Sequence, residues 1–246
     1  YNKSTDAYCY IGTEKPNHDV VIVGWDDSYS KDNFNTDLEG DGAFICQNSW
    51  GDNFGENGFF YISYYDTNIG THNVVYTDIE NTDNYDHIYQ SDLCGWVGQL
   101  GYNKDSIYGA NVFTAEGNET LKAASFYATG KDSQYELYVV RQFEDETSLE
   151  KMIPVASGKL GNAGYYTVDF NQGIEVDAGE RYAVVLYIIT PGSVHPMAIE
   201  YAADEATENV DLDDGESYIS ANGSKWVSVD TVEKSNLCIK AFSDNR

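Results

Sequence analysis

The chain has 246 residues, of which 41 are acidic and 14 basic, so its formal net charge is −27. Such an acidic surface repels nucleic acid and anionic lipid, and no cluster of Lys or Arg is present to bind phosphate, which excludes nucleic-acid binding. No apolar stretch is long enough to span a bilayer, so we expect no membrane insertion. The length predicts one large or two smaller domains.

Three short apolar runs in the first third of the chain predict β-strands. Each run is rich in β-branched or aromatic residues and is bounded by Gly, Asn or Asp, as strands are. The runs cover residues 20–25, 43–46 and 58–62. A polar loop separates the first two runs, and a turn rich in Gly and Asn separates the last two.

A polar, acidic segment without periodicity, residues 77–86, predicts a domain boundary. We therefore expect domains at residues 1–80 and 81–246. The second domain contains at least eight more strand candidates and almost no helical periodicity. The run 181–189 is apolar on both faces, as a central strand is. The predicted fold is mainly β, with a β-sandwich or jelly roll in the second domain. Other clear strand candidates are residues 122–129, 135–143, 165–170, 174–177, 197–201 and 237–242.

The four cysteines are widely spaced and form no CxxC pair, so neither a zinc site nor a dense disulfide framework is expected. Cys46 and Cys238 lie in apolar runs and are interpreted as small core residues. Cys9 and Cys94 lie outside such runs.

Two polar segments flank the first two predicted strands. Taken singly, a His at the start of a strand is usually structural, and an Asn-Ser-Trp-Gly segment is an ordinary turn. About thirty residues apart on neighbouring strands, they form a specific constellation. The segments are Asn17-His18-Asp19-Val20 and Gln47-Asn48-Ser49-Trp50-Gly51.

These motifs resemble the second half of the papain-like cysteine peptidases. The segments Val21–Ser30 and Ile62–Asp66 look like the bacterial, secreted branch of that family. The resemblance covers roughly residues 1–76 and implies part of the papain-like β-barrel subdomain. It implies that His18 is the catalytic imidazole and that Asn48 accepts a hydrogen bond from its second ring nitrogen. Trp50 would pack over this pair, with Gly51 and Asn17 in supporting roles. Two positions depart from the family pattern without removing a reacting group, namely Asp19 and Phe54.

The nucleophilic cysteine of that family is not found in this sequence. In the family it follows a glutamine and lies more than a hundred residues before the histidine, whereas seventeen residues precede His18 here. Cys9 has neither a helix signal nor a neighbouring Gln, so we expect it to be a strand or loop residue. The resemblance therefore implies a partner, an upstream fragment that carries the cysteine. On its own the chain is predicted to be catalytically inactive, as a product of proteolysis or of truncation.

Two acidic loops offer oxygen ligands at the close spacing that calcium prefers, but both lack the length and terminal Glu of an EF-hand. Solvated turns are favoured, so no cofactor is expected and calcium stays the alternative. The loops are residues 37–42 and 211–216. The other histidines, His72, His87 and His195, are predicted to lie in polar connecting segments or turns.

From about Ile88 the sequence resembles the lectin-like domain that follows bacterial papain-like peptidases. The motifs are strand and turn residues, such as Gly95-Trp96 and the runs 89–92, 110–114 and 121–127. Trp96 and Trp226 are predicted to be exposed, where they could stack on sugar rings, although a sandwich core needs aromatic residues equally.

Three functions follow as hypotheses. The first is a part of a secreted or cell-surface bacterial cysteine endopeptidase that acts on peptide or protein substrates. The second is a module that binds a glycan or cell-wall partner and carries an inactive peptidase remnant. The third is a pseudo-peptidase whose nucleophile has been replaced, against which the retained His18, Asn48 and Trp50 argue.

Overall fold

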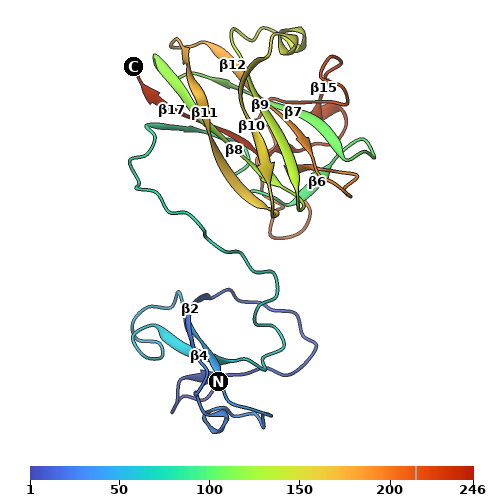
Figure 1. Cartoon of the computed structure of the whole chain (residues 1–246). Coiled ribbons are helices and arrows are strands. Elements are labelled where there is room, and N and C mark those ends of the chain that lie inside the picture. The colour runs from blue at the N-terminus through green and yellow to red at the C-terminus, as the bar shows by residue number, and fades with distance from the viewer. Residues whose placement is uncertain (214) are drawn as a thin grey trace. The chain divides into compact units, whose positions relative to one another are not determined.

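The computed structural model describes residues 1–213 and 215–246. The chain divides into two compact units, Tyr1–Thr77 (unit 1) and Asp78–Arg246 (unit 2), both built from β-strands (Figure 1). Within the described residues the only helical segments are three short 3-10 turns, so the prediction of a mainly β protein is confirmed. These turns are Lys31–Asn33, Glu146–Glu150 and Val229–Thr231. In the part of the chain that the structure describes, no helix has the length and apolarity needed to cross a membrane.

Unit 1 contains a four-stranded sheet in the order β1-β4-β3-β2. Strands β2, β3 and β4 pair antiparallel, whereas β1 lies parallel to β4. The three apolar runs predicted from the sequence correspond to β2, β3 and β4 within one residue at each end. The strand bounds are β1 Ala7–Tyr8, β2 Val21–Asp26, β3 Ala43–Gln47 and β4 Phe59–Ser63.

Unit 2 contains a six-stranded sheet, β10-β9-β12-β7-β14-β15, a four-stranded sheet, β11-β8-β17-β5, and a three-stranded sheet, β16-β13-β6. The strand bounds are β5 His87–Tyr89, β6 Gly98–Leu100, β7 Ser106–Thr114, β8 Glu119–Ala128, β9 Ser133–Val140, β10 Ile153–Leu160, β11 Gly164–Val176, β12 Arg181–Ile189, β13 Met197–Glu200, β14 Ser217–Ser220, β15 Val227–Ser228, β16 Asn236–Leu237 and β17 Ile239–Asn245.

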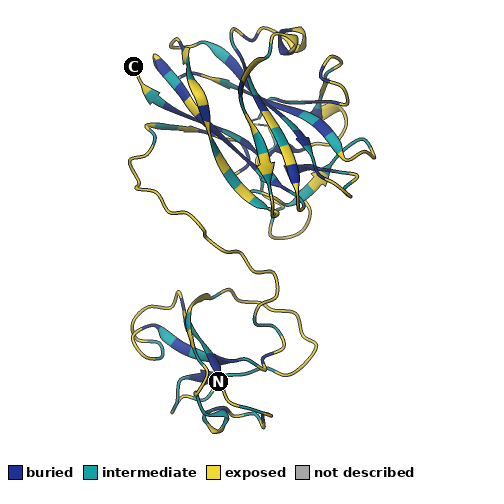
Figure 2. Ribbon diagram, viewed as in Figure 1, coloured by how far each residue is buried: buried dark blue, intermediate teal, exposed yellow. Residues whose placement is uncertain are grey.

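The main core of unit 2 joins side chains from the two larger sheets. Ile107 and Leu186 come from the six-stranded sheet, Phe126 and Ile239 come from the four-stranded sheet, and all four are almost fully buried. Buried and exposed positions alternate along many of the strands, as expected when one face of each sheet covers the core (Figure 2). Strand β12 lies between β9 and β7 and is buried along most of its length, which confirms its predicted central place.

The sequence predicted two separate strands where the structure has one. Residues 165–170 and 174–177 were predicted as separate strands, but β11 is continuous from Gly164 to Val176. The pairing of β11 with β8 shifts register between Asp169 and Ile174. The residues that separate the two predicted strands, 171–173, therefore lie in an irregularity within one strand and not in a turn.

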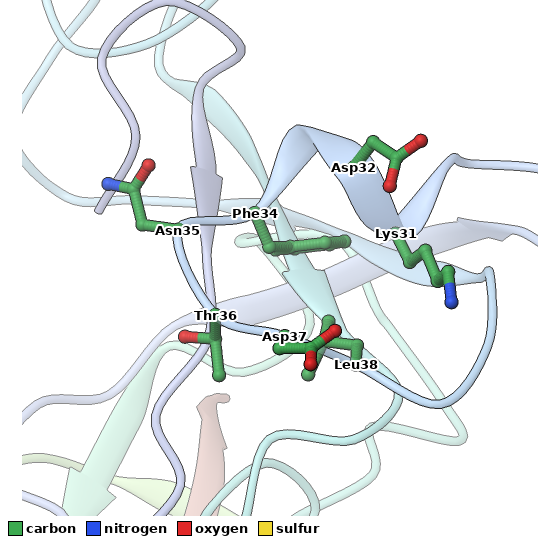
Figure 3. A pocket seen from close by; sticks show the side chains of 7 residues that line it. All are labelled: Lys31, Asp32, Phe34, Asn35, Thr36, Asp37 and Leu38. Atoms are coloured by element: carbon green, nitrogen blue, oxygen red, sulfur yellow. The ribbon is translucent and has the colours of Figure 1, made fainter.

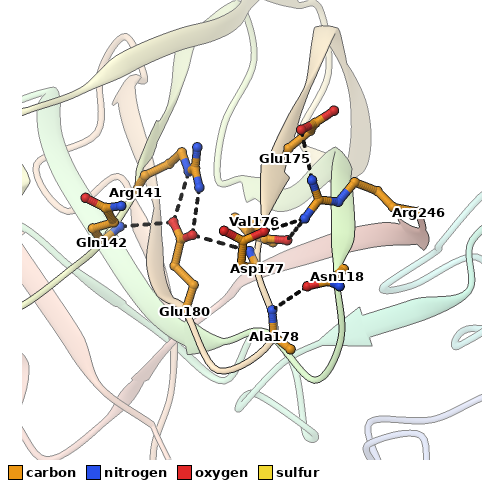
Figure 4. A network of polar contacts seen from close by, with 9 residues as sticks. All are labelled: Asn118, Arg141, Gln142, Glu175, Val176, Asp177, Ala178, Glu180 and Arg246. Carbon is orange, nitrogen blue, oxygen red and sulfur yellow. Dashed lines mark hydrogen bonds and ion pairs between the residues drawn. The ribbon is translucent and has the colours of Figure 1, made fainter.

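A network of polar contacts connects the turn after β11 to its neighbours (Figure 4). Arg141 donates two hydrogen bonds to the carboxylate of Glu180, at 2.9 and 2.7 Å. Arg246 pairs with Glu175 and Asp177 on the other side of the turn. Because β11 and β12 belong to different sheets, these contacts hold the place where the chain passes from one sheet to the other.

Candidate active site

Two strand ends bring His18 and Asn48 together. Strands β2 and β3 are antiparallel, with Val21 opposite Gln47. His18 lies three residues before β2 begins, and Asn48 comes directly after β3 ends. Because the two strands are antiparallel, both residues lie at the same end of the strand pair. Nε2 of His18 lies 3.0 Å from Oδ1 of Asn48, as the sequence predicted for the pair.

The hydrogen bonds of Asn48 determine which ring nitrogen of His18 carries a proton. Oδ1 of Asn48 also accepts a hydrogen bond from the backbone N–H of Ser49 at 2.8 Å, so this atom is the amide oxygen. An amide oxygen only accepts, and therefore Nε2 of His18 is the N–H donor. The neutral imidazole is then left with Nδ1 as its free basic nitrogen.

One face of the imidazole, which is otherwise exposed, is covered by an aromatic side chain. Trp50 stacks on His18 with ring centroids 5.0 Å apart, and Phe54 meets Trp50 edge-on, also at 5.0 Å. Asn48 is 8% exposed beneath this pair, whereas the indole itself is 62% exposed. Shielding from water strengthens the hydrogen bond between His18 and Asn48. The packing of Trp50 over the pair agrees with what the resemblance implied, and Phe54, at a position that departs from the family pattern, supports the indole from the side.

The turn between β3 and β4 depends on glycines. Gly51, Gly55 and Gly58 have φ values of +82°, +56° and +90°, in the region that disfavours side chains. At Gly55 a Cβ would lie 2.1 Å from the carbonyl oxygen of Phe59, so no other residue fits without a shift of the backbone. The turn closes when the N–H of Asn48 donates to the carbonyl of Gly58 at 2.9 Å.

The remaining predicted residues of unit 1 take no part in the hydrogen bond between His18 and Asn48. Asn17 and Asp19 are exposed, and within the described residues the side chain of Asn17 makes no hydrogen bond. His72 is exposed and has a φ of +56°. In unit 2, His195 lies before Pro196 as predicted, but His87 opens strand β5 and its ring contacts Asn245, so its prediction as a connecting residue was wrong.

The surroundings of all four cysteines raise the pKa of their thiols. Burial and then the Asp66 carboxylate raise the pKa of the Cys9 thiol, and burial raises the pKa of Cys46 to about 12. Burial also raises the pKa of Cys238, and desolvation followed by the nearby Glu200 raises that of Cys94. Catalytic thiols need the opposite shift. Cys46 and Cys238 are buried, which confirms their prediction as core residues.

The acidic loop 37–42 borders a hollow of about 330 Å³ that is lined by Lys31, Asp32 and residues 34–38 (Figure 3). Of its carboxylate groups, that of Asp41 is engaged within unit 1, because it accepts a hydrogen bond from the N–H of Lys31 at 2.9 Å. In the second loop, Asp213 pairs with Lys234 and Glu216 pairs with Arg181, while Asp214 lies outside the described residues. Within the described residues no group of three or more His, Cys, Asp or Glu side chains is placed to hold a metal ion.

The two tryptophans of unit 2 differ in exposure. Trp96 is 37% exposed and packs beside Tyr127, with centroids 5.8 Å apart. Trp226 was predicted to be exposed, but it is half-buried against a second hydrophobic cluster and its indole nitrogen is shielded from solvent. Its neighbour in the sequence, Val227, lies on the edge strand β15, which explains why the local pattern resembled a surface segment.

Comparison with known proteins agrees with both halves of this description. Residues 88–243 match the lectin-like domain family, and residues 2–79 match the papain family of cysteine proteases. The chain belongs to the lectin-like domain family and carries the C-terminal part of a papain-like protease domain. A comparison with curated proteins found no match.

Two solved structures resemble the whole chain. The clostridial cysteine protease Cwp84 after propeptide cleavage has a TM-score of 0.82 and 29% identity, covering 100% of this chain and 62% of that one. The cysteine protease and lectin-like domains of Cwp84, a surface-layer-associated protein of Clostridium difficile, give a TM-score of 0.78 and 28% identity, with 100% and 56% coverage. This chain therefore spans less than two thirds of the relatives it resembles.

Proposed function

We propose that the chain is the histidine-bearing part of a secreted or cell-surface bacterial cysteine endopeptidase. The observation that carries the proposal is the orientation of His18, whose Nε2–H donates to Asn48 and whose Nδ1 is left free. A cysteine thiol placed against Nδ1 would lose its proton to the imidazole and become a nucleophile. The thiolate would attack the carbonyl carbon of a peptide substrate, and the C–N bond would break as the imidazolium protonates the leaving amine. Water would then hydrolyse the resulting thioester, which releases the acid product and restores the thiol.

The nucleophile in this proposal comes from an upstream part of the same protein. Two observations support a partner of this kind. All four thiols of this chain have pKa values raised by their surroundings, which disfavours the thiolate. In addition, β2 exposes Val21, Val23 and Trp25 at 57%, 50% and 68%, an apolar strip that a partner segment would cover.

The peptidase proposal is tested by combining the chain with the upstream segment of its own protein. The combined protein should hydrolyse a peptide substrate and react with an epoxide inhibitor of cysteine proteases, whereas the 246-residue chain should do neither. His18→Ala should lower kcat/KM by roughly 10²- to 10⁴-fold, because a general acid–base is lost. His72→Asn is the control, since His72 is an exposed histidine of the same unit and Asn accepts its positive φ.

Two results would contradict the proposal. Hydrolysis by the 246-residue chain that is lost in Cys9→Ser would place the nucleophile at Cys9. Full activity of His18→Ala in the combined protein would remove His18 from the mechanism.

A second role, binding of a glycan or cell-wall partner by unit 2, is favoured by the match of residues 88–243 to the lectin-like family. This role needs no nucleophile and can operate beside the first.

A further inference from the structure

The face of the six-stranded sheet that points away from the main core is only partly covered. Over Ala183 and Val185 a second hydrophobic cluster is completed by the segment 143–152, with Phe143 and Leu149 buried in it. This cover ends before Tyr187, which is half-buried and stacks on Tyr108 with centroids 4.2 Å apart and an interplanar angle of 20°.

A cleft of about 300 Å³ lies beside Tyr187. Register places most of its side chains on one face, because Glu136 of β9 is opposite both Ser157 of β10 and Tyr187 of β12. Tyr135 also borders the cleft, but its side chain packs against the main core. One row along, Gln134 is opposite both Lys159 and Ile189. The cleft thus combines an aromatic and an aliphatic floor with an amide, a carboxylate, a hydroxyl and an ammonium group.

The polar groups of the cleft have bonding capacity left for a ligand. The Tyr138 hydroxyl donates to Oε2 of Glu136, which orients the carboxylate. Among the described residues, Oε1 of Glu136 and the side chains of Gln134 and Lys159 have no hydrogen-bond or ion-pair partner within the chain. Exposed groups of this kind are otherwise satisfied by water.

This chemistry fits a sugar ring, which has an apolar C–H face and an edge of hydroxyl groups. The face of a tyrosine ring packs against the former, while amide and carboxylate groups bind pairs of the latter. The net charge of −27 disfavours anionic sugars. We propose that the cleft between β10, β9 and β12 binds a neutral oligosaccharide. The inference rests on the binding role proposed for unit 2 and is independent of the peptidase role.

A second group of aromatic residues on unit 2 fits less well. On the four-stranded sheet, the ring of Tyr127 packs beside those of Trp96 and Tyr165, with ring centroids 5.8 and 5.0 Å apart. The polar groups there are already paired, since the Tyr165 hydroxyl donates to Ser125 at 2.6 Å and Lys240 lies 2.7 Å from the buried Asp92. Tyr165 is 44% exposed and therefore provides a matched aromatic control.

Calorimetric titration of the 246-residue chain tests the proposal, with N-acetylglucosamine, cellulose and starch oligosaccharides as neutral probes and polygalacturonate oligosaccharides as the anionic probe. At least one neutral probe should bind. Gln134→Ala and Glu136→Gln should each weaken that binding roughly tenfold, because the first removes a hydrogen-bonding amide and the second replaces a charged acceptor by a neutral amide. Tyr187→Ala should also weaken it, whereas Tyr165→Ala should not. Gln134 and Glu136 are exposed, so their variants remain informative if Tyr187→Ala does not fold.

The possible failures are distinguishable. Binding of a neutral probe that survives all three cleft variants would overturn the location while keeping the glycan role of unit 2, above all if Tyr165→Ala abolished it. A preference for the anionic probe would overturn the proposed ligand class. Binding of none of the probes would overturn both the cleft and the glycan role, and none of these results would bear on peptide hydrolysis.

Discussion

The amide of Asn48 shows how one side chain can set the chemistry of another. Its oxygen accepts from the N–H of Ser49 and from Nε2 of His18, at 2.8 and 3.0 Å, so the imidazole has one favoured tautomer. A backbone donor is the more reliable partner here, because its position is fixed by the turn that follows β3.

The first prediction concerns this tautomer. In the 246-residue chain at a pH where His18 is neutral, nitrogen NMR should show the proton on Nε2. Asn48→Ala should let the two tautomers mix, because the acceptor that selects one of them is gone. Ser49→Ala keeps the backbone N–H and should leave the tautomer unchanged. A proton on Nδ1 in the unaltered chain would contradict the proposed catalytic role of His18.

At this scale the sequence indicated the pair and its cover, because the motifs around His18 and Asn48 are specific. It did not indicate that Ser49 fixes the amide, since a backbone N–H has no signature in the sequence. It also misjudged Trp226, whose burial depends on Tyr108, a residue more than a hundred positions earlier in the chain.

Among the elements, the turn from Asn48 to Gly58 positions the site and tolerates little change. A second prediction compares two of its glycines, both with positive φ. Gly51→Ala should cost about 1 kcal/mol for the strained backbone, because nothing lies within 4 Å of the new Cβ. Gly55→Ala should cost about 3 kcal/mol or more, since its Cβ would meet the Phe59 carbonyl. Hydrogen exchange of unit 1, read by mass spectrometry, measures both losses, and equal losses would contradict the steric explanation.

A third prediction concerns the central strand β12. Leu186 is 1% exposed in the main core of unit 2, so Leu186→Ala should cost about 2–5 kcal/mol through lost burial and a residual cavity. Leu93 is 74% exposed in the same unit, and Leu93→Ala should change the free energy of unfolding by less than about 0.5 kcal/mol. Hydrogen exchange across β7, β9 and β12 reports the difference, and similar protection in the two variants would argue against this core.

The strands themselves were largely predictable, because alternation and β-branched runs report burial within a few residues. Their assembly was not. The segment after β11 turns at Gly179, which in sequence resembles a hairpin turn, yet β11 pairs with β8 and β12 pairs with β7 and β9. Pairing of this kind is decided by packing between distant segments, so a local pattern cannot report it.

Over the whole molecule, most of the many carboxylates are exposed. The dependence of the folding stability on acidic pH is therefore expected to come from the few carboxylates that accept hydrogen bonds inside the fold. Burial alone would raise the pKa of Glu119, but hydrogen bonds from Ser243, Tyr89 and the N–H of Gly117 outweigh it and hold the pKa below its usual value. The folded state therefore binds this proton less readily than the unfolded chain. The resulting stabilisation is complete above the unfolded pKa, about 4.3, and is lost as pH falls through the folded value.

The last prediction follows from that sign. The melting temperature of the unaltered chain should fall as pH is lowered from about 5 to about 2. Glu119→Gln should be less stable at neutral pH, where the charged acceptor is missing, and should lose less stability on acidification. Glu150→Gln removes an exposed carboxylate of the same unit and should follow the unaltered chain. If Glu119→Gln showed the same pH dependence as the unaltered chain, acid unfolding of unit 2 would have to be assigned to other carboxylates, first to Glu180, whose pKa is also lowered, by its ion pair with Arg141.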